Sequence, residues 1–156
     1  MTQTICPVPD LEKAFPPSPA CSCDTCRSFC ARPGWWTVRQ AISAMRAGYA
    51  SRMMLEVAPD FTYGVLAPAF RGCENGFALQ PFAKNGCGFL ENGLCTLHAT
   101  GHLPLECAYC HHDRPGEGTV CHEALGRDWN TPEGRALIGL WSATNHLWER
   151  FGIDSP

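Results

Sequence analysis

Apolar residues recur every three or four positions in two parts of the chain, and each part predicts a helix. The first, residues 37–48, begins with Thr37 and Gln40 in the spacing of a capping box and stops at Gly48. The second begins with Thr131 as an N-cap and Pro132 at the first helical position. Its apolar stripe is wide enough to face the core, so we interpret its tryptophans as core residues. The stripe comprises Leu137, Leu140, Trp141, Thr144, Leu147, Trp148 and Phe151.

Shorter elements are predicted between these helices. Residues 49–57 favour a short helical turn that Pro59 ends, and residues 61–70 favour an extended segment in which Pro68 disfavours a central strand position. The turn signal at 91–93 lies between CGFL and LCTLH and predicts a small hairpin. The predicted fold is therefore mainly α, with irregular cysteine-rich loops and a short β-hairpin, in a small metal-centred single domain.

A chain of 156 residues suits one domain. Residues 1–20 contain five prolines and predict an extended arm, which leaves residues 21–156 as a single cysteine-rich, metal-binding domain. The net charge of −3 gives no attraction to nucleic acid or to an anionic membrane. The first twenty residues lack the basic and apolar regions of a signal peptide, so we expect a cytoplasmic protein. Its partner would be an unidentified protein or redox partner.

The unusual feature of the composition is its eleven cysteines. Eight of them fall into two clusters, and we predict that these eight bind metal. They are Cys21, Cys23, Cys26, Cys30, Cys87, Cys95, Cys107 and Cys110. Thiols stay reduced in the cytoplasm, and closely packed thiolates repel one another unless a cation neutralises them. Disulfides are one alternative, and a redox dithiol in the C-x-x-C motif of Cys107 and Cys110 is another.

The spacing of these cysteines does not decide which metal they bind. It matches neither the paired C-x2-C knuckles of a zinc ribbon nor the C-x2-C-x2-C-x3-C-P run of a ferredoxin. Four thiolates satisfy either one tetrahedral Zn²⁺ or one [4Fe–4S] cluster. Because eight exceed the need of one zinc site, we favour an iron–sulfur cluster, with Zn²⁺ as the alternative. Five nearby residues are further candidates for ligands or for donors to the thiolates: Cys73, Cys121, His111, His112 and His122.

The remaining polar and aromatic candidates have plainer alternatives. Trp35 and Trp36 would shield a metal from water or pack against the helix from Thr37. Glu106 and Asp113 are candidate acids or bases, but such neighbours are common on surfaces. The sequence contains no G-x-S-x-G, H-E-x-x-H or phosphate-binding loop, so we assign no catalytic residue.

The second cluster, CGFLENGLC…LPLEC, resembles the signature of the YkgJ-type cysteine-cluster family, a zinc- or iron-chelating domain. Cys87, Cys95, Pro104 and Cys107 match that signature, Leu103 replaces its usual arginine, and CSCDTCRSFC matches its compact first motif loosely. The resemblance implies a metal site within residues 21–110. Three functions follow as hypotheses: an iron–sulfur protein for electron transfer, sensing or metal handling, a zinc-binding structural module that presents a partner surface, or an enzyme that uses a cysteine-ligated metal cluster.

Overall fold

The computed structural model describes residues 10–144. Its α-helices are α1 (Leu11–Ala14), α2 (Asp24–Cys30), α3 (Val38–Ala44), α4 (Leu105–Tyr109), α5 (Glu117–Trp129) and α6 (Pro132–Thr144). Shorter helical turns are η1 (Met45–Tyr49), η2 (Ala50–Arg52) and η3 (Gln80–Asn85). The strands are β1 (Met53–Val57), β2 (Gly64–Pro68), β3 (Gly76–Phe77), β4 (Leu90–Glu91) and β5 (Leu94–Cys95). Within residues 10–144, no helix has the length and apolar character needed to cross a membrane.

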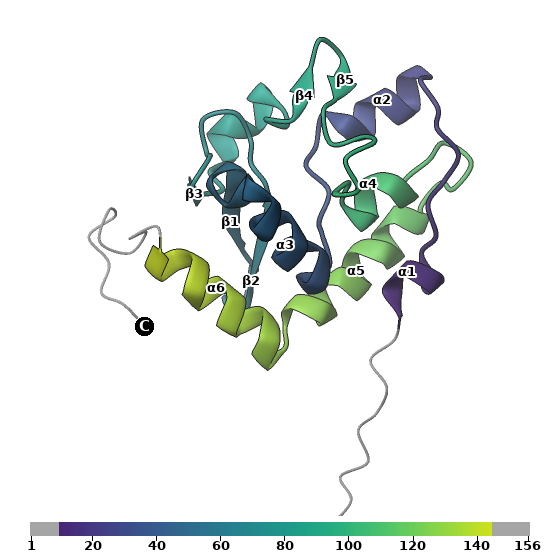
Figure 1. The fold of residues 1–156 in the computed structure, drawn as a ribbon. Coiled ribbons are helices and arrows are strands. Elements are labelled where there is room, and N and C mark those ends of the chain that lie inside the picture. Colours follow the sequence, from purple (N-terminus) through teal and green to yellow (C-terminus); the bar gives the residue numbers. More distant parts are fainter. Residues whose placement is uncertain (1–9, 145–156) are drawn as a thin grey trace, which may run out of the picture.

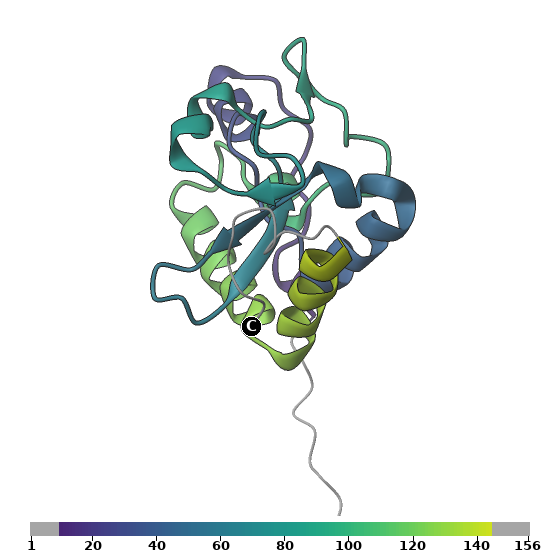
Figure 2. The ribbon, with the colours of Figure 1, turned by 90° about the vertical axis from the view of Figure 1, so that its left-hand side faces the viewer.

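A three-stranded sheet in the order β2-β1-β3 lies beside the helices (Figures 1 and 2). β1 pairs with β2 in antiparallel fashion from Met53 opposite Pro68 to Val57 opposite Gly64, and it pairs with β3 in parallel. Pro68 ends the edge strand β2, which agrees with the predicted extended segment and with the exclusion of Pro68 from a central strand. The prediction of a mainly α fold is thus right only in part.

The helical turn predicted for residues 49–57 is correct for η2 and wrong for the residues that follow it. Met53–Val57 form the central strand of the sheet. Met and Leu are good helix formers, so local preference favours a helix here. Met53, Met54 and Leu55 are all buried, and strand pairing on both sides with this burial overrides the local preference.

The helix starts and the hairpin predicted from local signals are confirmed. Thr37 and Gln40 form both hydrogen bonds of a capping box at the start of α3, and Gly48 leaves the helical conformation with a φ of 101°. The Thr131 hydroxyl accepts a hydrogen bond from the Gly134 N–H at the start of α6. β4 and β5 pair across Asn92 and Gly93, which both have positive φ. The end of the predicted stripe, including Leu147, Trp148 and Phe151, lies outside the described residues, as does His146.

Three tryptophans with no exposed surface form the centre of the core: Trp36, Trp129 and Trp141. Each indole N–H donates to a backbone carbonyl from a distant segment, so burying these rings leaves no N–H unpaired. Trp36 donates to His102 at 2.7 Å, and Trp129 donates to Trp36 at 2.8 Å. Trp141 donates to Ala50 at 2.9 Å, which fixes α6 against η2. Trp35 and Trp36 are 7% and 0% exposed, which agrees with the packing alternative for these two rings.

The cysteine-rich segments gather at the end of the molecule away from α6, where α2, α4 and the β4–β5 hairpin lie (Figure 1). The described part of the proline-rich arm crosses this end. Ser18 donates from its N–H to the Ala108 carbonyl at 2.8 Å and from its hydroxyl to the Tyr109 carbonyl at 2.6 Å. Phe15 packs edge-on against the Tyr109 ring, with the centroids 5.1 Å apart. Residues 10–20 therefore lie on α4.

Two glycines of α6 give opposite predictions for the same substitution. A Cβ at Gly134 would lie 2.2 Å from the Trp129 carbonyl oxygen, whereas a Cβ at Gly139 would meet nothing within 4 Å. We expect Gly134→Ala to destabilise the protein by about 1–3 kcal/mol because the backbone must shift. Gly139→Ala should stabilise it by about 0.5–1 kcal/mol because alanine restricts the unfolded chain. Urea unfolding of the two variants tests both signs, and equal effects would contradict the packing of α6 on Trp129.

Candidate metal centre

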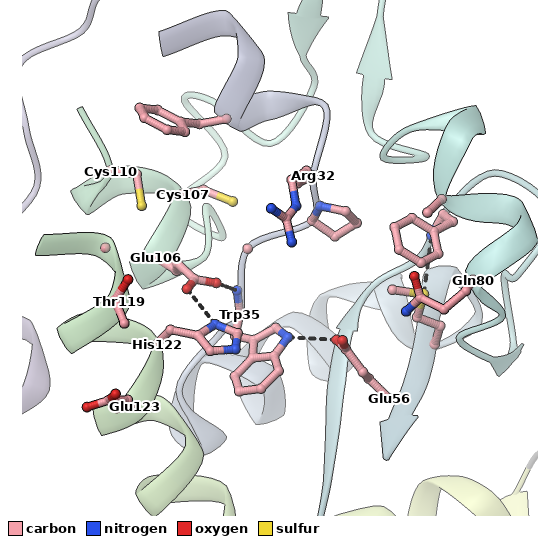
Figure 3. Close-up of a pocket in the computed structure, with 17 residues that line it drawn as sticks. Arg32, Trp35, Glu56, Gln80, Glu106, Cys107, Cys110, Thr119, His122 and Glu123 are labelled. Atoms are coloured by element: carbon pink, nitrogen blue, oxygen red, sulfur yellow. Dashed lines mark hydrogen bonds and ion pairs between the residues drawn. The ribbon is translucent and has the colours of Figure 1, made fainter. Parts of the chain in front are cut away.

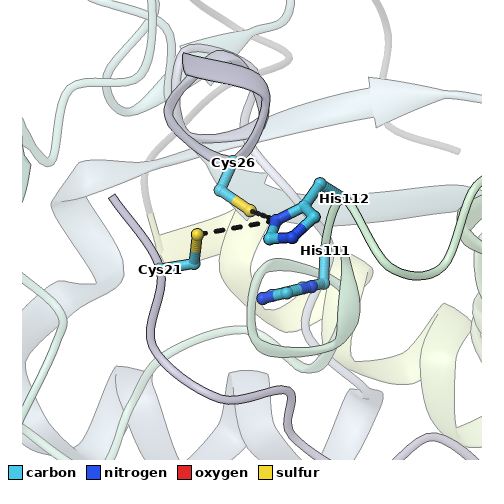
Figure 4. Close-up of side chains that lie close together, drawn as sticks. All are labelled: Cys21, Cys26, His111 and His112. Carbon is cyan, nitrogen blue, oxygen red and sulfur yellow. Dashed lines mark hydrogen bonds between the residues drawn. The ribbon is translucent and has the colours of Figure 1, made fainter. Parts of the chain in front are cut away.

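Cys21, Cys26, His111 and His112 lie close together between α2 and the loop after α4 (Figure 4), and Cys23 Sγ lies 3.4 Å from His112 Nδ1. We call this set, Cys21, Cys23, Cys26, His111 and His112, the Cys/His group. Cys23 is the N-cap of α2, and its Sγ accepts a hydrogen bond from the Cys26 N–H at 3.5 Å. α4 ends at Cys110, whose extended backbone turns the chain so that the two histidines reach α2. Residues about 90 positions apart are thereby brought together.

The Nδ1 atom of His112 faces the three sulfurs of the group at nearly equal distances. It lies 3.5 Å from Cys21 Sγ, 3.4 Å from Cys23 Sγ and 3.3 Å from Cys26 Sγ. A tetrahedral zinc ion has Zn–S distances of about 2.3 Å and Zn–N distances of about 2.0–2.1 Å, which place a nitrogen and a sulfur ligand about 3.5 Å apart. The three nitrogen–sulfur distances therefore fit one tetrahedral ion.

The other ring nitrogen of His112 has a carboxylate partner. His112 Nε2 lies 3.1 Å from Asp113 Oδ1, and an ionised carboxylate can only accept a hydrogen bond. This carboxylate favours a proton on Nε2, and in that tautomer the lone pair of Nδ1 faces the sulfurs. Carboxylates commonly orient metal-binding histidines in this way. Asp113 is therefore placed to favour the tautomer that metal binding needs.

His111 is the alternative nitrogen ligand of the group. Its side chain is buried, its ring stacks on that of His112 with centroids 4.2 Å apart, and its Nδ1 accepts from the Asp113 N–H at 3.1 Å. One ligand atom from each of Cys21, Cys26, His111 and His112 lies within 4.8 Å of all the others. A single ion needs only four ligands, and His112 is the histidine that contacts all three sulfurs.

The thiols of this group differ in their readiness to lose a proton. The hydrogen bond from the Cys26 N–H is the main cause that lowers the pKa of Cys23 to about 7, with smaller contributions from the neighbouring thiols and His112. Burial is the main cause that raises the pKa of Cys26 to about 11. Cys23 is thus available as a thiolate near neutral pH, whereas Cys26 needs a bound cation to become one.

A second set of cysteines, the four-cysteine group, comprises Cys30, Cys87, Cys95 and Cys107. Burial raises the pKa of Cys30, raises that of Cys87 to about 11 and raises that of Cys107 further still. The charge of Cys95 adds to each of these three shifts, so the four thiols share one neighbourhood. In the described part of the chain, however, no three of these sulfurs lie within 4.8 Å of one another. Their spacing is wider than that of the Cys/His group.

The structure divides the predicted ligands differently from the order of the sequence. Cys30 belongs to the first cluster in the sequence but lies near Cys87, Cys95 and Cys107 in the structure. His111 and His112 lie near Cys21, Cys23 and Cys26. Cys110 belongs to neither group, and burial and the Glu106 carboxylate raise its pKa to about 11. Cys73 and Cys121 are buried in the core, and His122 bonds to Glu106 at 2.7 Å instead of approaching either group. All ten described cysteines are free thiols.

Asp113 provides a test of the Cys/His group that leaves every ligand in place. Asp113→Ala should lower metal affinity about 10–100-fold, because His112 loses the partner that fixes its tautomer and ring orientation. Glu117→Ala, which removes an exposed carboxylate at the start of α5, is the matched control and should change nothing. Competition with a chromogenic chelator gives both affinities. Equal affinities of the two variants would exclude the orienting role of Asp113.

Comparisons of the chain with protein-family models, with curated proteins and with solved structures find no match. The resemblance to the YkgJ-type family accordingly stays a prediction. What the protein binds is inferred from its own residues.

Proposed function

We propose that the protein binds a single tetrahedral metal ion, Zn²⁺ by preference, through Cys21, Cys23, Cys26 and His112. The observation that carries this proposal is the set of three Nδ1–Sγ distances between 3.3 and 3.5 Å. Three thiolates and one imidazole form a soft donor set that selects zinc over magnesium or calcium. Because four protein ligands fill the coordination shell, the ion would be structural and would leave no position for a substrate.

The ion would fasten two segments that the fold otherwise joins weakly. Residues 21–26 are mostly exposed and lie against the loop at 111–112. Ligands from both segments make the binding free energy of the ion part of the folding free energy. The ion would thereby hold the start of α2 against this loop. This role matches the hypothesis of a zinc-stabilised module.

The four-cysteine group supports a second centre, and for it we retain the iron–sulfur hypothesis. Four thiolates that share one neighbourhood but lie too far apart for one ion suit a cluster that takes one thiolate per iron. The backbone approaches this group closely, since a Cβ at Gly34 would lie 2.6 Å from Cys107 Sγ. A bound cluster would supply one-electron chemistry for electron transfer or sensing, and the burial of Cys87 would keep water from that side of it.

Metal and sulfide analysis of protein purified without air tests both centres. Cys26→Ser changes a ligand of the Cys/His group only, so it should remove about one equivalent of zinc and leave iron unchanged. Cys87→Ser should remove iron and sulfide and leave zinc unchanged. Cys73→Ala, which changes a core thiol outside both groups, is the control. If one substitution removed both metals, the two groups would form one shared centre, and protein without any metal would contradict the proposal.

A further inference from the structure

A cavity of about 530 Å³ opens beside the four-cysteine group, between α4, α5, β1, η3 and the segment that follows α2. This volume is typical of pockets that take small organic ligands. Its apolar wall includes Phe29, Trp35, Met54 and Phe70, and its polar side chains come from several separate elements (Figure 3). No residue of the Cys/His group lines this cavity.

One part of the cavity wall is fixed by a closed chain of interactions. Glu106 accepts from the Trp35 N–H at 3.0 Å, and its second oxygen lies 2.7 Å from His122 Nδ1. The His122 ring stacks on the Trp35 indole with the centroids 3.8 Å apart. The indole N–H in turn donates to Glu56 Oε2 at 2.8 Å. The residues Glu106, His122, Trp35 and Glu56 therefore form a preorganised wall across α4, α5 and β1.

Opposite charges face this cavity without pairing. The Arg32 guanidinium points into the space above the Trp35 indole, and the Glu56 carboxylate lies at the other end of the indole (Figure 3). Within residues 10–144, Arg32 makes no ion pair or side-chain hydrogen bond, and Glu56 has the Trp35 indole as its hydrogen-bond partner. The hydrogen bond to Glu106 is the main cause that raises the pKa of His122, and the charge of Glu56 adds a smaller contribution. Arg32 and Glu56 are thus more than 4.0 Å apart, and both line the same cavity of about 530 Å³.

A ligand that carries only a positive or only a negative charge would be repelled by a side chain of the same charge in this cavity. A carboxylate at Arg32 would lie among Glu56, Glu106 and the rim residue Glu123, whereas an amine at Glu56 would approach Arg32. A molecule that carries both charges would satisfy both ends, with its carboxylate on the planar guanidinium and its ammonium group on Glu56. The apolar wall then has to accept the rest of the molecule.

We propose that this cavity binds a zwitterionic α-amino acid with an apolar side chain, held between Arg32 and Glu56. The ammonium group would bond to the Glu56 oxygen that the indole does not use. The side chain would pack on Met54 and Phe70. Since Cys107 lines the same cavity, the bound amino acid would lie beside the four-cysteine group.

Isothermal titration of the whole protein with L-leucine, L-methionine and L-phenylalanine tests the proposal. At least one should bind, and its analogues without the amino group or without the carboxylate should bind about tenfold or more weakly. For phenylalanine these analogues are 3-phenylpropanoate and 2-phenylethylamine. If none of the three amino acids binds, or if either analogue binds as tightly as the amino acid, the proposal is wrong.

Two variants test which side chain binds the carboxylate of the ligand and which binds its ammonium group. Arg32→Gln should weaken the amino acid about tenfold or more without weakening the amine analogue, while Glu56→Gln should weaken the amino acid without weakening the acid analogue, because each change also removes the side chain that repels that analogue. Glutamine at position 56 can still accept from the Trp35 indole, so the wall is preserved. Arg39→Gln, on the exposed side of α3, is the matched control. Unchanged binding in Arg32→Gln would overturn the proposal.

Discussion

Removing the metal should release residues 21–26 from the loop at 111–112 and lower the free energy of unfolding by about 3 kcal/mol or more. Zinc present at about 100 times its dissociation constant contributes about 2.7 kcal/mol through linkage, and structural zinc sites in peptides release about 10–16 kcal/mol on binding. For a chain of this size, a loss of about 3 kcal/mol lowers the melting temperature by roughly 6–12 °C. Calorimetry before and after treatment with a chelator measures the change.

Amide exchange locates the effect and supplies the control. Chelation should raise exchange in α2 and around His112, while α6, which packs on β2 and α3, should keep its protection. The Cys26→Ser variant should already have the lower melting temperature and should respond little to the chelator. A wild-type protein whose stability and exchange are unchanged by full metal removal would contradict a structural role for the ion.

Trp141→Ala should destabilise the protein by about 3–5 kcal/mol without changing its metal content. The indole has no exposed surface, and its N–H donates to the Ala50 carbonyl, so truncation leaves both a cavity and an unpaired carbonyl. Leu140→Ala is the matched control, because the neighbouring side chain is 62% exposed and should contribute little. Chemical unfolding and metal analysis of the two variants provide the comparison. Loss of metal with retained stability in Trp141→Ala would contradict the interpretation of Trp141 as a core residue.

The elements that sequence reasoning predicts correctly are those with local signals. The capping box at Thr37, the N-cap at Thr131 and the turn at 91–93 each act within a few residues, so their structures do not depend on the rest of the fold. β1 has no such signal. Its residues favour a helix, and only pairing with β2 and β3 makes Met53–Val57 a strand.

Helix α5 could have been recognised from its sequence. Cys121, Ala124, Leu125 and Trp129 recur at three- and four-residue spacing and are all buried. The signal is weak because two of the four side chains are small. Gly116 and Gly118 at the start of the segment also resemble a loop, although Gly116 adopts a positive φ of 77° just before the helix begins.

The candidate site shows where sequence proximity misleads. Four cysteines within ten residues suggest one ligand set, yet Cys30, one helical turn beyond Cys26 at the end of α2, does not belong to the Cys/His group. The loop after α4 brings candidate nitrogen ligands to this group instead of more sulfur. His111 and His112 could be named as candidates because they directly follow Cys110, whereas the role of Asp113 depends on a side-chain orientation that spacing does not encode.

Zinc-edge X-ray absorption of the protein as purified tests the central claim most directly, because it reports the atoms bound to the ion. A single tetrahedral ion held by Cys21, Cys23, Cys26 and His112 predicts a shell of three sulfurs at about 2.3 Å and one nitrogen at about 2.0–2.1 Å. The nitrogen contribution should disappear or be replaced in a protein that carries both His111→Ala and His112→Ala. A shell made only of oxygen and nitrogen, or a purified protein that holds no metal at the Cys/His group, would contradict the claim.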